Sequence, residues 1–137
     1  MQSPKSLSWL YRESDQCGGN LNAASIFDHQ NVLSDDEAKQ IYRYMTNGVE
    51  LLTFVSPLQD PINPQDVLPM IFYSDGVYFW NSVVANWVKR NRIRLPLEFM
   101  EHALAAKELP NSRSDLDPIE LIPLINHAIP LIIKAEQ

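Results

Sequence analysis

The sequence predicts an α+β fold, in which a small antiparallel sheet of three or more strands packs with several helices in a single domain over residues 1–137. Three observations predict it. A helix-capping pattern precedes an apolar stripe in residues 34–46. The pair Asp75-Gly76 separates two apolar runs, which is typical of a β-hairpin. Asn81 follows the second run, where the apolar spacing changes from that of a strand to that of a helix.

The first helix is expected over residues 35–46. Ser34 and Glu37 have the spacing of a capping box, in which each side chain accepts a hydrogen bond from the backbone N–H of the other residue. Acidic residues fill the first turn, where the helix dipole favours them. One face of the helix is apolar and carries Ala38, Ile41, Tyr42 and Met45. Gly48 stands just beyond the last turn, so we expect it to stop the helix.

The sheet is expected to begin with the apolar, β-prone residues 49–55. Residues 56–64 contain three prolines and predict a loop. Residues 70–73 and 77–80 predict two antiparallel strands, joined by a tight turn at Asp75-Gly76 in which both central residues have positive φ.

The returning strand is apolar on both sides. Alternation places Tyr78 and Trp80 on one face of the sheet and Val77 and Phe79 on the other. If both faces are apolar, helices should cover both of them.

Two further helices and a broken helical segment are expected after the sheet. Asn81 predicts the cap of a helix over residues 82–91. Pro96 predicts the start of the next helix, whose apolar stripe is Phe99, Met100, Ala103 and Leu104. Residues 111–117 are polar and predict a loop. Pro118 can start a last helix, which Pro123 and Pro130 should divide or kink.

Composition indicates a folded acidic domain. Hydrophobic residues make up 45% of the chain, so wholesale disorder is excluded. The net charge of -6 disfavours general nucleic-acid binding and favours a basic protein partner. A single cysteine, Cys17, allows no internal disulfide, and the interrupted apolar stretch at 116–135 is no membrane span. We therefore expect a cytoplasmic protein.

Two side-chain combinations are candidates for chemistry. Glu98 and His102 share a helix face and are either part of a metal site or a surface ion pair. Cys17 with His29 or His127 is a candidate nucleophile and base, although a lone cysteine is more often a small buried apolar residue. Because the chain has no motif for a catalytic triad, a phosphate loop or a zinc site, we expect no enzyme, no metal and no cofactor.

Charged segments provide candidates for recognition. The one basic cluster, Lys89–Arg94, is an RNA-binding candidate, a set of cations at a helix C-terminus, or a partner for carboxylates of this chain or another. Five acidic residues in predicted loops or helix starts are either ordinary caps or a negative patch for a basic partner: Asp60, Asp66, Asp115, Asp117 and Glu120.

One pattern resembles a known family. The run Ser74–Trp80, then Val84, Trp87 and Val88, then Arg94–Phe99 looks like small acidic bacterial proteins in which a T/S-D-G-x-x-x-W turn precedes a short helix and an LPxEF-type helix start. The strand near residue 50 and Asp66-Val67-Leu68 also fit. Ala85-Asn86-Trp87 replaces the usual aromatic pair of the helix. Some such proteins are similar to immunity proteins of contact-dependent inhibition or related toxin systems.

The resemblance implies a protein that binds and neutralises one cognate toxin domain, such as a basic nuclease, by covering its active site or substrate groove. The five acidic residues are then the candidate contacts with the toxin. The alternatives are a regulatory or scaffold protein that binds another partner, and a small enzyme that uses Cys17 or the pair Glu98 and His102.

Overall fold

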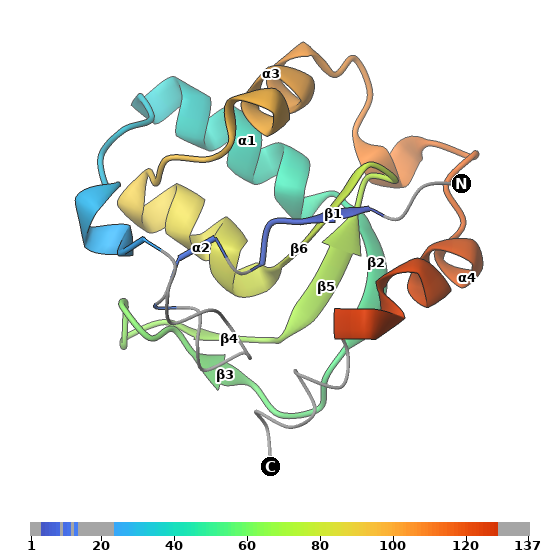
Figure 1. Cartoon of the computed structure of the whole chain (residues 1–137), viewed down its shortest axis with the longest axis horizontal. Coiled ribbons are helices and arrows are strands. Elements are labelled where there is room, and N and C mark those ends of the chain that lie inside the picture. The colour runs from blue at the N-terminus through green and yellow to red at the C-terminus, as the bar shows by residue number, and fades with distance from the viewer. Residues whose placement is uncertain (1–3, 9, 12, 14–23, 129–137) are drawn as a thin grey trace.

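The structure, a computed structural model, describes residues 4–8, 10–11, 13 and 24–128, and it has the predicted α+β architecture (Figure 1). Its helices and strands, in chain order, are β1 (Lys5–Ser6), η2 (Ile26–Asp28), α1 (Asp35–Thr46), β2 (Val49–Thr53), β3 (Leu58–Gln59), β4 (Val67–Leu68), β5 (Ile71–Ser74), β6 (Tyr78–Asn81), α2 (Ser82–Asn91), α3 (Leu97–Ala105), η3 (Pro110–Ser112), α4 (Pro118–Leu121) and η4 (Ile122–Ala128).

The main sheet has four strands in the order β1-β6-β5-β2. The three predicted strands pair antiparallel, with β5 between β2 and β6. The short strand β1 adds a parallel edge beside β6, so the sheet is mixed rather than purely antiparallel. A second sheet, β3 paired with β4, lies partly within residues 56–64, where a loop was expected; each of its strands has only two residues, too few to form a period-2 pattern.

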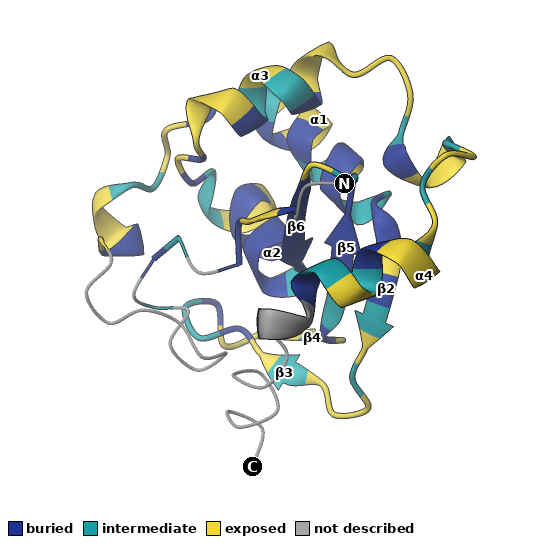
Figure 2. Cartoon of the chain, turned by 45° about the vertical axis from the view of Figure 1, so that its right-hand side comes forward, coloured by how far each residue is buried: buried dark blue, intermediate teal, exposed yellow. Residues whose placement is uncertain are grey.

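Helices cover both faces of the main sheet. Figure 1 shows α1, α2 and α3 together on one side of it and α4 on the other. Figure 2 shows that the central strands β5 and β6 are buried along almost their whole length. Tyr78, Phe79 and Trp80 are buried on β6, as expected for a strand with two apolar faces. Val77 lies in the turn before β6 and is exposed, so its assignment to the strand was wrong.

The hairpin between β5 and β6 differs from the predicted two-residue turn. Three residues, Asp75 to Val77, join the strands, and only Gly76 has positive φ, at 91°. Asp75 instead holds the turn through its side chain: Oδ1 accepts hydrogen bonds from the backbone N–H of Val77 at 2.9 Å and of Tyr78 at 2.7 Å. A carboxylate that binds two residues ahead stabilises a turn without positive φ at its own position.

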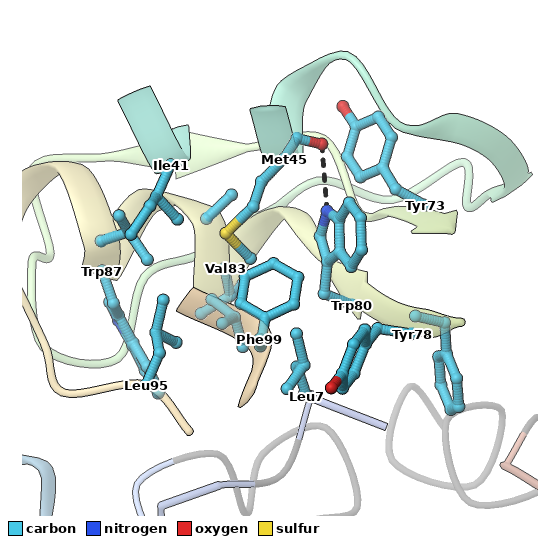
Figure 3. Packing of buried hydrophobic residues seen from close by; sticks show 14 of the residues in the cluster. Leu7, Ile41, Met45, Tyr73, Tyr78, Trp80, Val83, Trp87, Leu95 and Phe99 are labelled. Atoms are coloured by element: carbon cyan, nitrogen blue, oxygen red, sulfur yellow. Dashed lines mark hydrogen bonds between the residues drawn. The ribbon is translucent and has the colours of Figure 1, made fainter. Parts of the chain in front are cut away.

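The junction between α1 and the sheet explains Gly48. Ser34 and Glu37 form the predicted capping box, and α1 has the predicted bounds. Its C-cap is Asn47, and Gly48 has no positive φ, so the expected stop signal was wrong. A Cβ on Gly48 would lie 2.8 Å from Cβ of Tyr73, so glycine is required by the close approach of the chain to the sheet. Trp80 closes this junction by donating its indole N–H to the carbonyl of Met45 at 3.0 Å (Figure 3).

The later helices follow their predicted signals. Asn81 caps α2 through the backbone N–H of Val84, and α2 has the predicted bounds. Pro96 stands one position earlier than expected, at the N-cap of α3. The last segment is divided into α4 and η4 beside Pro123, as predicted, whereas Pro130 lies outside the described residues. The single turn η3 begins at Pro110 and overlaps the start of the predicted loop 111–117. In the part of the chain that the structure describes, no helix is both long and apolar enough to cross a bilayer.

Candidate functional site

The candidate site is an acidic cavity at the tip of the β5–β6 hairpin. Its volume is about 180 Å³, and its lining includes Asp115, Asp117 and Glu120. Asp75, Gly76 and Val77 of the turn also line it, together with the cationic side chain of Arg113. The fold therefore brings three of the five predicted acidic residues to one concave surface.

These three carboxylates have different surroundings. Asp115 forms a two-point ion pair with Arg113, at 3.1 Å from Nε and 2.6 Å from Nη2, and the hydrogen bonds from Arg113 hold the pKa of Asp115 below its usual range. Asp117 caps α4 by accepting the backbone N–H of Ile119 at 2.9 Å, which confirms the interpretation of Asp117 as a cap. Glu120 is exposed, and its side chain has no hydrogen bond or ion pair with the residues described. Of the three carboxylates, that of Glu120 is thus the one without a partner among the described residues and the most available to another protein.

Asp60 is not available to a partner, which corrects its assignment to the binding surface. Its side chain is fully buried between the β3–β4 hairpin and α2. Both oxygens are occupied: Oδ1 accepts from the indole N–H of Trp87 at 2.8 Å, and Oδ2 accepts from the side-chain amide of Asn86 at 2.7 Å. The backbone N–H groups of Ile62 and Asn63 and the side-chain amide of Asn63 supply three further bonds. Asp60 anchors the hairpin to α2.

Asp66 also lies at the junction between the β3–β4 hairpin and α2, and it does not line the acidic cavity. It accepts two hydrogen bonds from Arg90, at 2.9 and 3.0 Å, and one from Asn86 at 3.0 Å. The bond from Asn86, followed by those from Arg90, lowers the pKa of the Asp66 carboxyl. Asp66 is partly buried and already paired within the chain.

A second constellation surrounds a buried carboxylate that the sequence did not reveal. Asp75 is fully buried, and its Oδ2 accepts the hydroxyl of Tyr44 at 2.6 Å and lies 3.1 Å from Nε2 of His102. Burial, and then the hydrogen bond to Asp75, raises the pKa of Tyr44. These three side chains come from α1, the hairpin turn and α3, so no local motif could have indicated them.

His102 and Tyr44 face a cavity of about 350 Å³ that also includes Lys107, Glu108 and Arg113 in its lining. Nε2 of His102 lies 3.1 Å from the carboxylate of Asp75, which orients the ring. No serine, threonine or cysteine among the described residues is hydrogen-bonded to His102. The arrangement therefore supplies an oriented imidazole, with no described hydroxyl or thiol of serine, threonine or cysteine hydrogen-bonded to it.

The other candidates for chemistry are separated in the structure. Glu98 pairs with Lys5 at 3.6 Å, whereas His102 pairs with Asp75, so the two residues form neither a mutual ion pair nor a shared site. No group of three or more potential metal ligands occurs within residues 4–8, 10–11, 13 and 24–128. Cys17 lies outside the described residues, as does the side chain of His127. The ring of His29 packs against Tyr11.

The basic cluster Lys89–Arg94 is largely used within the chain. Arg90 pairs with Asp66, and Arg92 lies 3.4 Å from Asp35. The ammonium group of Lys89 lies over the ring of Tyr42. These contacts agree with the interpretation that the cluster holds carboxylates of this chain. Arg94 has no such partner among the described residues.

No protein-family model, no curated protein and no solved structure matches this chain significantly.

Proposed function

We propose that this chain is an immunity protein that binds a cognate bacterial toxin domain and blocks its active site or substrate groove. The observation that carries the proposal is that Asp115, Asp117 and Glu120, three of the five acidic residues predicted as partner contacts, line one cavity. The resemblance of the segment from about residue 48 to 104 to small immunity proteins supports the same function.

The chemistry of the cavity favours a basic partner. Arg113 neutralises one of its carboxylates, Asp115, while the side chain of Glu120 has no ion pair with a described residue. The chain as a whole carries a net charge of -6, which accelerates encounter with a positively charged surface. A nuclease has such a surface, because it must bind phosphates. The carboxylates would occupy the positions that phosphates take in the toxin groove.

The test is complex formation with a toxin domain encoded beside this chain. The full-length chain and the toxin domain are co-expressed, and the tagged chain is purified at micromolar concentration. The proposal expects a stable complex and survival of cells that produce both proteins. The absence of a complex, together with unprotected cells, would exclude the immunity function.

A regulatory or scaffold protein with another partner is the alternative that shares the same surface. A neighbouring gene that encodes no toxin favours it. In that case the acidic cavity would still bind a basic protein, and purification of the chain from its own cells would recover that protein rather than a toxin.

The pair formed by His102 and Asp75 favours one further alternative, a small enzyme. A buried carboxylate that orients an imidazole at a cavity is a common arrangement for general acid–base catalysis. The double variant Cys17→Ala, His102→Ala tests it. If this variant still protects cells and binds the toxin as the native protein does, catalysis by these groups is excluded.

A further inference from the structure

The helix α3 has an apolar side that faces away from the core. Phe99 and Ala103 are buried, and the ring of Phe99 packs against α1 and β6, whereas Leu97 is 68% exposed and Leu104 is 38% exposed. Leu97, Glu101 and Leu104 stand at positions i, i+4 and i+7, so they share the outer side of the helix. Half-buried Met100 was predicted to belong to the same stripe as Phe99, and it lies at the border of this outer side.

A groove adjoins this side. Its volume is about 490 Å³, and its lining is apolar apart from one charged residue, Arg94; the apolar residues are Leu10, Val32, Leu95, Pro96, Leu97 and Met100, with the ring of Tyr11. The hydroxyl of Tyr11 already donates to the backbone carbonyl of Arg94. The guanidinium of Arg94 is therefore the polar group that the groove offers to a ligand. The volume of the groove and its mostly apolar lining are typical of ligand-binding clefts.

The charges beside the groove are complementary to each other. The guanidinium of Arg94 and the carboxylate of Glu101 have no hydrogen bond or ion pair with any described residue. Glu98, on the same helix, is instead paired with Lys5. One surface thus carries a cation and an anion without partners among the described residues, together with exposed leucines. We call this surface the α3 outer face and define it as Arg94, Leu97, Met100, Glu101 and Leu104.

We propose that the α3 outer face is a homodimer interface, in which two copies of this chain meet about a twofold axis. An interface of this kind must be complementary to itself, because the same residues come from both copies. Here each copy supplies an apolar side chain, Leu97, for the groove of the other, and a carboxylate, Glu101, for its Arg94. A different protein would need its own matching set of charges and apolar groups, whereas a second copy already has one.

The first test measures the mass of the full chain by sedimentation equilibrium, at protein concentrations up to about 1 mM. The native protein should rise reversibly from 15.7 kDa toward twice that mass. Leu97→Glu should remain a monomer, and its circular dichroism should be native because Leu97 is exposed. Val55→Glu is the matched control, since Val55 is fully exposed in the loop after β2, outside the α3 outer face, and should dimerise like the native protein.

The second test exchanges the charges. Arg94→Glu and Glu101→Arg should each weaken dimerisation about three- to fivefold, and the double variant should regain most of the loss. A monomer at every concentration overturns the proposal and leaves the groove to another protein. Growth beyond a dimer contradicts the twofold arrangement, and equal dimerisation of Leu97→Glu and Val55→Glu excludes this face.

Discussion

Trp87 on α2 donates its indole N–H to Oδ1 of Asp60, over 2.8 Å, and thereby fixes the β3–β4 hairpin against the helix. The carboxylate is fully buried, and each of its five hydrogen bonds comes from an uncharged donor. A carboxylate buried away from solvent is stable only while hydrogen-bond donors of the protein occupy its lone pairs. The small second sheet therefore depends on one acidic side chain.

Asp60→Asn should destabilise the protein by about 2–4 kcal/mol, because an amide NH₂ group would face donors that need an acceptor. Urea unfolding of the full chain measures the change. Asp28→Asn is the control, since Asp28 is exposed on η2, and it should alter the free energy of unfolding little. Equal stability of the two variants would show that the Asp60 network does not hold the hairpin.

Gly76→Val should destabilise the protein by about 1–3 kcal/mol or more, because a β-branched residue resists positive φ. The new Cβ would also lie 2.8 Å from Cδ2 of Leu116, at the acidic cavity. Thermal unfolding of the variant and of the native protein measures the difference in stability. Val77→Ala changes an exposed side chain of the same turn and should keep nearly native stability. A native melting temperature for Gly76→Val would mean that the turn is built differently.

Asp66→Asn should destabilise the protein at neutral pH, and this destabilisation should shrink in acid. The pKa of the Asp66 carboxyl is lower in the folded chain, because Asn86 and Arg90 bind the charged form. Its contribution is therefore present at neutral pH and is lost as the pH falls below about 4 and through the folded pKa. Urea unfolding at pH 7 and near pH 3 should show a difference between native and variant proteins that shrinks in acid. A difference that stays constant would exclude the pairing.

Tyr44→Phe should cost about 1–3 kcal/mol at neutral pH, because buried Asp75 loses one donor. Burial and the bond to Asp75 raise the pKa of Tyr44, so the folded state favours the neutral hydroxyl. This contribution is present below the unfolded pKa of about 10 and is lost as the pH rises beyond it. The stability of the variant should accordingly fall less steeply above pH 10 than that of the native protein.

Tyr42→Phe is the control for this change. The hydroxyl of Tyr42 has no hydrogen bond with a described residue, and its ring can still contact Lys89. If Tyr42→Phe and Tyr44→Phe have the same free energy of unfolding at neutral pH and above pH 10, the hydroxyl of Tyr44 does not stabilise Asp75.

Signals close together in the sequence predicted most of the fold. Ser34 with Glu37, and Asn81, each fix a helix start through hydrogen bonds that span three residues, so α1 and α2 have the predicted bounds. The β3–β4 hairpin was missed because two-residue strands form no periodic pattern. Gly48 was misinterpreted because its neighbours Tyr73 and Trp80 are remote in sequence.

The candidate site was predictable only in part. Asp115, Asp117 and Glu120 lie close in sequence, and their common cavity follows from α4 folding beside the hairpin. Asp60 is indistinguishable in sequence from an exposed loop carboxylate, because its donor Trp87 is 27 residues away. Tyr44 and Asp75 are separated by 31 residues and meet only through the packing of α1 on the hairpin.

The most direct test of the central claim is the affinity of the toxin domain for the variant Glu120→Lys, measured by calorimetry at low and high salt. Glu120 has no hydrogen bond or ion pair through its side chain with the described residues, so its reversal should leave the fold intact. Asp28→Lys changes the net charge equally and controls for the overall field. We expect Glu120→Lys to weaken binding at least tenfold at low salt, by about 1.4 kcal/mol or more, and Asp28→Lys to weaken it much less. Equal affinities for both variants and the native chain would contradict a role of the acidic cavity in recognition.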